Sequence, residues 1–226
     1  MCGRFTQHHN TGEIEERFEA REAVIPVTAR YNIAPQQDIA VVVAPNPTAV
    51  RVLDGYRWGL VPGWAKDPAI GQKMINARSE TLTEKPSFRN ALTRRRCLIP
   101  ADGFYEWERH TDGTRHPVHF RLASGDLFAF AGLWEEWHEP GTDTLLRTCT
   151  IVTTSANETV GKVHDRMPVM LSRDAEPIWM DATVRDTDVL RALLIPYPDR
   201  EMETFAVSRR VNTPGNEGAD LLERVV

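Results

Sequence analysis

The stretch CLIPADGFYEWERHTDGTRHPVHFRLASGDLFAFAGLW, residues 97–134, decides the fold of this chain. It consists of short runs rich in β-branched and aromatic residues, each bounded by Gly, Asp or Pro, which is the pattern of successive β-strands. With the run that follows it, the stretch predicts strands at residues 97–99, 104–107, 117–122, 127–134 and 147–153. Because helices do not alternate with these strands, a mostly antiparallel sheet is predicted rather than a parallel βαβ fold.

The rest of the chain adds strands and short helices around this sheet. Further strands are predicted at residues 39–44, 49–53, 56–60 and 204–208, the first ended by Pro45-Asn46-Pro47 and the next two joined as a hairpin at Asp54-Gly55. Helices are predicted at residues 11–20, capped near Thr11, at 155–163, capped by Ser155, and at 85–94, 175–180 and 186–194. We therefore expect an α+β fold with one domain over residues 1–226 and a mostly antiparallel, barrel-like sheet flanked by short helices. Residues 138–144 are expected to form a surface loop.

The composition is that of an ordinary globular protein, with 41% hydrophobic and 26% charged residues in a chain of 226. No apolar run is long enough for a membrane span, and the N-terminus lacks the pattern of a secretory signal. Three unclustered cysteines argue against a disulfide framework and fit a reducing cytosol, with Cys97 and Cys149 expected to be buried. The formal net charge of −5 disfavours indiscriminate coating of nucleic acid but leaves room for a local basic cleft.

Cys2 directly follows the initiator Met1. Its small side chain allows Met1 to be trimmed, and the mature chain would then carry an α-amine and a thiol on adjacent carbons. The pKa values of these groups start near about 8 and about 8.5, so modest tuning would make both reactive near neutral pH. Such a pair can form an imine with an aldehyde and then close to a thiazolidine.

Three further segments place reactive side chains among turn and strand signals: NARSET at residues 76–81, PADGFYEW at 100–107 and HDRMP at 164–168. Glu106 should share a strand face with Phe104, where desolvation would raise its pKa and suit it to acid–base work. Taken alone, Glu106 would be a surface residue, His164 a structural hydrogen-bonding residue on a turn and Asn76 a turn or cap residue.

For other residues the sequence predicts only burial or exposure to solvent. Trp58 is expected in the core, and the arginines at 94–96 are expected to be solvated surface charges. The sequence has no cluster of His, Cys, Asp and Glu with zinc-ligand spacing and no phosphate-binding glycine loop, so no metal and no cofactor are predicted.

In this order the segments resemble the SRAP family, the SOS-response-associated peptidase domain, over nearly the whole chain. The matching motifs are MCGR, WG-x-x-PxW followed by NAR-x-E, the DGFYEW segment and HDRMP. The resemblance implies a sensor and shield of abasic sites in single-stranded DNA that crosslinks to the ring-opened sugar through its terminal cysteine. It assigns Cys2 as nucleophile, Asn76 as orienting group, Glu106 as acid–base group and His164 as catalyst of ring opening and crosslink reversal.

The resemblance also implies how DNA would be held. Arg4, Arg78 and Arg166 would contact phosphates around the lesion, and Trp64 would stack on a neighbouring base. It implies a lyase-like activity and a DNA-repair role in the SOS response. The peptidase name would reflect only the removal of what precedes Cys2, by autocatalysis or by an aminopeptidase. We expect a cytoplasmic monomer that associates with the nucleoid after damage.

Two alternatives stay open. An amidohydrolase or glutamine amidotransferase domain also begins with a processed Met-Cys-Gly, uses the terminal amine as a base for the thiol, and gives no role to Glu106 and His164. A non-catalytic single-strand-binding module would bind DNA with a large salt dependence and without Cys2. A covalent adduct with abasic DNA that survives a denaturing gel distinguishes the SRAP-like function from both.

Overall fold

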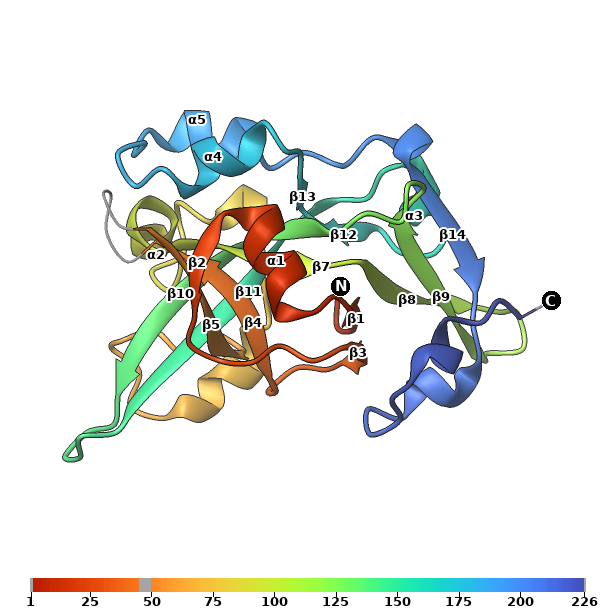
Figure 1. Cartoon of the computed structure of the whole chain (residues 1–226), viewed down its shortest axis with the longest axis horizontal. Helices are drawn as coiled ribbons and strands as arrows, with labels where there is room; N and C mark the ends of the chain where they lie inside the picture. The colour runs from red at the N-terminus through yellow and green to blue at the C-terminus, as the bar shows by residue number, and fades with distance from the viewer. Residues whose placement is uncertain (1, 45–49, 226) are drawn as a thin grey trace.

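The computed structural model describes residues 2–44 and 50–225, and within them two sheets meet at the N-terminal strand (Figure 1). The strands are β1 (Phe5–Gln7), β2 (Ala20–Ala23), β3 (Arg30–Ile33), β4 (Asp38–Val43), β5 (Arg51–Trp58), β6 (Asn76–Arg78), β7 (Arg96–Ala101), β8 (Gly103–Arg109), β9 (Arg115–Leu122), β10 (Phe128–His138), β11 (Leu145–Ser155), β12 (Arg166–Pro168), β13 (Met170–Leu171) and β14 (Met202–Ala206). The helices are α1 (Thr11–Phe18), α2 (Arg89–Arg94), α3 (Glu158–Gly161), α4 (Ala175–Met180) and α5 (Thr187–Ala192), with 3₁₀ turns η1 (Pro68–Lys73), η2 (Ser79–Thr81), η3 (Asp199–Glu201), η4 (Arg209–Asn212) and η5 (Ala219–Leu222).

The larger sheet closes into a barrel. Its strands run in the order β12-β11-β10-β7-β4-β5-β2, and β5 also pairs with β11 in parallel, Cys149 lying opposite Trp58. The ring β11-β10-β7-β4-β5 is otherwise antiparallel, and a barrel removes the exposed edges that an open sheet would leave. The predicted α+β fold with a mostly antiparallel, barrel-like sheet is thus confirmed.

The smaller sheet packs against the barrel and has the strand order β14-β9-β8-β1-β3. The chain passes from one sheet to the other at Asp102, because β7 belongs to the barrel and β8 to the smaller sheet. Phe5 of β1 lies at the junction, where its ring meets Trp58 and Phe130 edge-on at centroid distances of 5.3 and 5.8 Å. One buried cluster therefore spans both sheets and includes Cys2 and Phe5.

A second apolar cluster lies on the other side of the barrel strands. Residues alternate along β7, so that Cys97 and Ile99 belong to the first cluster and Leu98 to the second, as the period of a strand requires. Helix α1 contributes Ile14 and Phe18 to this second cluster, alongside apolar residues of α4 and α5. Among the described residues, no helix has the length and apolar character needed to cross a bilayer.

Most of the predicted strands are confirmed within a few residues, but the hairpin at Asp54-Gly55 is wrong. Strand β5 runs without a break from Arg51 to Trp58 and pairs with β4, Val41 lying opposite Asp54. Asp54 is buried and ion-paired with Arg147 at 3.0 Å, and a Cβ at Gly55 would approach Ile25 to 2.8 Å. The glycine serves close packing rather than a turn. Pro45-Asn46-Pro47, and residue 49 of the predicted strand, lie outside the described residues.

Helix α4 has the predicted bounds, the other four helices are shorter than predicted, the cap expected near Thr11 is confirmed at Asn10, and the cap at Ser155 is corrected. Helix α1 is capped by Asn10, which forms a capping box with Glu13. Ser155 still belongs to β11, and Asn157 caps α3 instead. The predicted surface loop is confirmed, since residues 139–144 connect β10 and β11 in an exposed hairpin loop.

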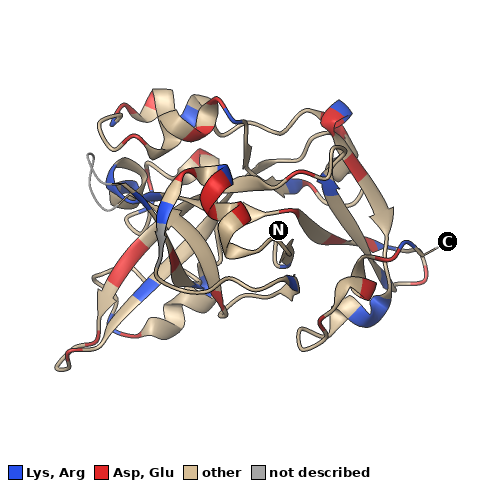
Figure 2. Cartoon of the chain, viewed as in Figure 1, with Lys and Arg blue, Asp and Glu red and all other residues tan. Residues whose placement is uncertain are grey.

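The buried tryptophan and cysteines are confirmed, but one predicted surface charge is not. Trp58, Cys97 and Cys149 have no exposed surface. Arg96, expected to be solvated, is only 5% exposed and donates hydrogen bonds to the carbonyl oxygens of Leu92, Trp179, Asp181 and Val184. Its guanidinium satisfies backbone acceptors left over at the ends of α2 and α4. Figure 2 shows the remaining charges of both signs interspersed over the fold.

Gly103, the first residue of β8, lies too close to its neighbours to carry a side chain. A Cβ at this position would lie 2.2 Å from Nε2 of the buried His119 and 2.9 Å from the carbonyl oxygen of Phe120. Gly103→Ala should therefore lower the free energy of unfolding by about 2 kcal/mol or more, because backbone and a packed ring must shift. Gly215→Ala is the matched control, since a Cβ there meets nothing within 4 Å. Equal midpoints of urea unfolding for the two variants would contradict this packing.

Candidate active site

Backbone pairing holds the N-terminal segment in place. Strand β1 pairs with β8, and the amide of Tyr105 donates to the carbonyl of Arg4 at 2.9 Å. Residue Glu106 follows Tyr105 and so lies beside the segment that begins at Cys2. The side chain of Cys2 is 0% exposed, and its Sγ lies 4.0 Å from the carbonyl oxygen of Arg4.

Asn76 fixes the backbone of Cys2 from the barrel side. It is the first residue of β6, which pairs in parallel with β11 opposite Ile151. Its Nδ2 donates a hydrogen bond of 2.8 Å to the carbonyl oxygen of Cys2. Its Oδ1 is buried and has no hydrogen-bond partner among the described residues, so it offers an acceptor to a donor on Cys2 or on a bound molecule.

Glu106 is a buried carboxyl group, only 4% exposed. Burial raises its pKa above the ordinary value, and the charge of His164 lowers it in part. Burial also raises the pKa of the Cys2 thiol well above its usual range, and the charge of Glu106 adds to that rise. Burial therefore favours the protonated thiol, and the reactivity expected of the terminal amine and thiol stays a prediction.

His164 completes the arrangement from the loop between α3 and β12. Its backbone amide donates to Val160 at 2.9 Å, so α3 sets its position. Its Nδ1 accepts the amide of Arg166 at 3.0 Å and lies 3.0 Å from the carboxylate of Asp165. When Nδ1 accepts this amide, the other ring nitrogen, Nε2, carries the proton. The side chain is 30% exposed, so it is more accessible than Cys2 and Glu106.

The structure thus brings together Cys2, Asn76, Glu106 and His164 from segments far apart in the sequence. Asn76 contacts Cys2 directly, and Glu106 interacts electrostatically with both Cys2 and His164. A protonated thiol, a carboxyl group of raised pKa and a partly exposed imidazole can pass protons among themselves and to a ligand.

Strand β11 also organises two predicted DNA contacts. Thr153 of β11 pairs with Arg78 on one side, and Ser155 pairs with Arg166 on the other. The side chain of Arg78 is exposed, on the same face of β6 as Asn76. Arg166 is less accessible, since it forms a bidentate ion pair with Glu80 and donates to the carbonyl oxygen of Thr153.

Trp64 lies apart from this cluster in the loop before η1, which leads into β6. Its side chain is 62% exposed, an unusual state for tryptophan that leaves the ring available for stacking.

Arg4 differs from the exposed arginines. It is only 9% exposed, and its Nη1 donates to Oδ1 of Asn32 at 2.6 Å and to the carbonyl oxygen of Val211 at 2.7 Å. Its guanidinium carbon lies 5.7 Å from the centre of the Trp107 ring. These contacts tie the segment after Cys2 to β3 and η4, and the phosphate contact predicted for Arg4 stays a prediction.

Sequence reasoning gave no role to Glu80 and Asp102, although both lie within the motifs. Glu80 pairs with Arg166, which lies in a different motif far along the chain, so the sequence gave no signal of that contact. Asp102 is buried at the junction of the sheets and accepts hydrogen bonds from the Thr6 hydroxyl and the His8 amide. An Asp-Gly pair at a strand boundary usually indicates only a turn.

Known proteins resemble this chain in sequence and in fold. The model of the family described as SOS response associated peptidase (SRAP) matches residues 1–214. The abasic site processing proteins YoqW and YoaM of Bacillus subtilis are each 46% identical to this chain, with 99% of the chain and 99% and 98% of the relatives covered. A crystal structure of a protein from Bacteroides thetaiotaomicron has a TM-score of 0.89 over 100% of both chains at 20% identity, which shows the shared fold.

The burial of Arg4 and the exposure of Arg78 predict different defects. Arg4→Ala should lower the free energy of unfolding by roughly 1–3 kcal/mol, because Asn32 and Val211 lose a buried donor. Arg78→Ala should change it by less than about 0.5 kcal/mol. Arg78→Ala should instead weaken binding of single-stranded DNA and flatten its salt dependence by about one phosphate contact. Urea unfolding and salt titrations measure both. An unchanged salt dependence for Arg78→Ala would assign that arginine to structure.

Proposed function

The chain belongs to the SOS response associated peptidase (SRAP) family, and on that basis we propose that it processes abasic sites in single-stranded DNA by forming a covalent thiazolidine crosslink through Cys2. The observation that carries the proposal is the convergence of Asn76, Glu106 and His164 on the buried Cys2. The names of the relatives, abasic site processing proteins, support the substrate.

The first step opens the sugar. An abasic deoxyribose is mostly a closed hemiacetal, so a proton must leave its C1′ hydroxyl and another must reach the ring oxygen as the C1′–O4′ bond breaks. His164 is proposed to carry both protons, since its partly exposed imidazole is held by the Arg166 amide. The products are an aldehyde at C1′ and a hydroxyl at C4′.

The second step joins protein and DNA. Removal of Met1, by autocatalysis or by an aminopeptidase, would free the α-amine of Cys2. The amine nitrogen then bonds to C1′, and the resulting hydroxyl leaves as water when it takes a proton from Glu106. The raised pKa of Glu106 supports this role, because the buried carboxyl group keeps its proton closer to neutral pH than an exposed one.

The third step closes the ring. The thiol sulfur bonds to C1′ of the protonated imine, whose C=N electron pair moves to the nitrogen, and the thiol proton returns to the Glu106 carboxylate, which restores the proton given up in the second step. No external oxidant or cofactor is needed. Asn76 holds the Cys2 carbonyl during these steps, and fixing amine, thiol and aldehyde together supplies a large effective concentration.

The DNA would lie across the exposed side of this site. Arg78 and Arg166 are proposed to contact phosphates next to the lesion and Trp64 to stack on a base. Arg4 is proposed to support this surface chiefly by anchoring the segment that holds Cys2. The protein is proposed to act as a monomer on chromosomal DNA in the cytoplasm, as a lyase-like crosslinking enzyme whose peptidase activity is confined to exposing Cys2.

Loss of the thiol tests the crosslink. Cys2→Ala should abolish the heat-stable adduct with single-stranded abasic DNA on a denaturing gel, because ring closure needs the sulfur. Cys2→Ser should leave at most an imine that borohydride reduces. An adduct of parental yield from Cys2→Ala would rule out the mechanism, and glutamine hydrolysis without an adduct would favour the amidotransferase alternative.

Glu106 and His164 should fail at different steps. His164→Ala should slow adduct formation and also slow release into an excess of unlabelled abasic strand, because both directions move protons on the sugar oxygens. Glu106→Gln should slow formation of the imine, and any imine that does form should persist and be trapped by borohydride, because ring closure also uses the carboxylate. Each loss should cost roughly a hundredfold or more in rate.

Exposed neighbours serve as controls for these variants. Glu108→Gln lies two residues further along β8, and His138→Ala lies at the exposed end of β10. Both should form adducts at parental rates. Parental kinetics for His164→Ala, with an unchanged melting temperature, would remove its catalytic role.

A further inference from the structure

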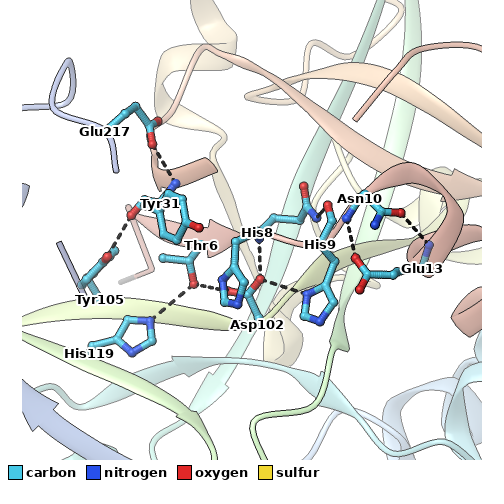
Figure 3. A network of polar contacts seen from close by, with 11 residues as sticks. Thr6, His8, His9, Asn10, Glu13, Tyr31, Asp102, Tyr105, His119 and Glu217 are labelled. Atoms are coloured by element: carbon cyan, nitrogen blue, oxygen red, sulfur yellow. Dashed lines mark hydrogen bonds and ion pairs between the residues drawn. The ribbon is translucent and has the colours of Figure 1, made fainter. Parts of the chain in front are cut away.

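A second cluster of polar side chains lies at the other end of β1, where the chain crosses between the two sheets. Figure 3 shows Asp102 at its centre, with the side chains of His8 and His9 on either side. His8 and His9 follow the last residue of β1, and Asp102 lies between β7 and β8. One ligand-type atom from each of the three lies within 4.8 Å of the other two.

The distances from Asp102 to the two rings are those of ion pairs, and they are also short enough for the three side chains to share one ion. Nδ1 of His8 lies 2.9 Å from Oδ1 of Asp102, and Nδ1 of His9 lies 3.4 Å from Oδ2. Metal–nitrogen and metal–oxygen bonds of about 2.0–2.2 Å place neighbouring ligand atoms roughly 2.8–3.6 Å apart. Nδ1 of His8 is buried and makes no hydrogen bond within the described part of the chain, although the carboxylate is this close.

The carboxylate is held in a fixed orientation by other donors. The Thr6 hydroxyl donates to Oδ1 of Asp102, and the amide of His8 donates to Oδ2 at 2.6 Å. The side chain of Asp102 is only 1% exposed. Such orienting contacts are the usual surroundings of a ligating carboxylate.

The histidines leave a path for an ion to enter. Their side chains are 35% and 22% exposed, and the two rings stack at a centroid distance of 5.1 Å. Glu13 lies nearby but is engaged in the capping box with Asn10. Two imidazoles and one carboxylate with open positions form a donor set for zinc and related first-row divalent ions.

We propose that His8, His9 and Asp102 form a binding site for a divalent transition-metal ion, Zn²⁺ in the first instance, with water in the remaining positions. The ion would join the end of β1 to the junction of the two sheets. Because β1 leads back to Cys2, occupancy would strengthen the strand that holds the nucleophile without entering the crosslinking chemistry. The sequence predicted no metal because adjacent histidines and an aspartate far along the chain show no ligand spacing.

The test is a titration of the metal-stripped full-length Cys2→Ala protein with Zn²⁺ by calorimetry and with Co²⁺ by visible absorption. The Cys2→Ala background removes the terminal aminothiol, which could itself chelate metal. We expect saturable binding of one ion per chain and a melting temperature that rises with Zn²⁺. His8→Gln or His9→Gln should weaken binding at least about tenfold, and the double variant should abolish both the binding and the rise in melting temperature.

The control is the double variant His110→Gln/His116→Gln. These rings also lie close together, at a centroid distance of 4.2 Å, in the exposed β8–β9 hairpin. This variant should bind as the parent does. Asp102 is left intact, because it also accepts hydrogen bonds that support the fold. No saturable binding by the parent, equal binding by the His8/His9 double variant, or loss of binding in the His110/His116 control would each overturn the proposal.

Discussion

The burial of the first residues of the chain is the constraint on which the rest of the structure depends. Chain termini usually fray unless they are tied down. Here Phe5 fills the junction between barrel and smaller sheet, Arg4 bonds to Asn32 and Val211, and Thr6 bonds to Asp102. The segment is therefore part of the core, and Cys2 has one position relative to the barrel.

That position explains why the reactive groups come from so many elements. Strand β8 pairs with β1 and brings Glu106, while β11 sits between β6, with Asn76, and β12, just after His164. Burial has a cost for a nucleophile, since it raises the pKa of the Cys2 thiol. The same burial raises the pKa of Glu106, so that the carboxyl group becomes a suitable proton donor and acceptor for that thiol. In the proposed mechanism the amine reacts first and the protonated thiol closes the ring.

Local patterns predicted the strands well, because alternation and turn residues depend on neighbours along the chain. They failed where a contact distant in the sequence decides the outcome. The Asp54-Gly55 pair predicts a turn, but Gly55 packs against Ile25 within a strand. Arg96 was predicted to be a surface charge, but it donates hydrogen bonds to carbonyl groups of two helices. The residues around Cys2 were predicted through the motifs of the family. The cluster of His8, His9 and Asp102 could not be predicted, since only the crossing between the sheets brings it together.

The central claim is that the terminal amine and thiol of Cys2 both bond to the abasic sugar. Intact mass spectrometry of the adduct with a defined abasic oligonucleotide tests it most directly. The account predicts a mass equal to the chain without Met1 plus the oligonucleotide minus one water, and no change after borohydride, because a thiazolidine has no C=N bond to reduce. A crosslinked chain that retains Met1, or an adduct that gains two hydrogens on reduction, would contradict it.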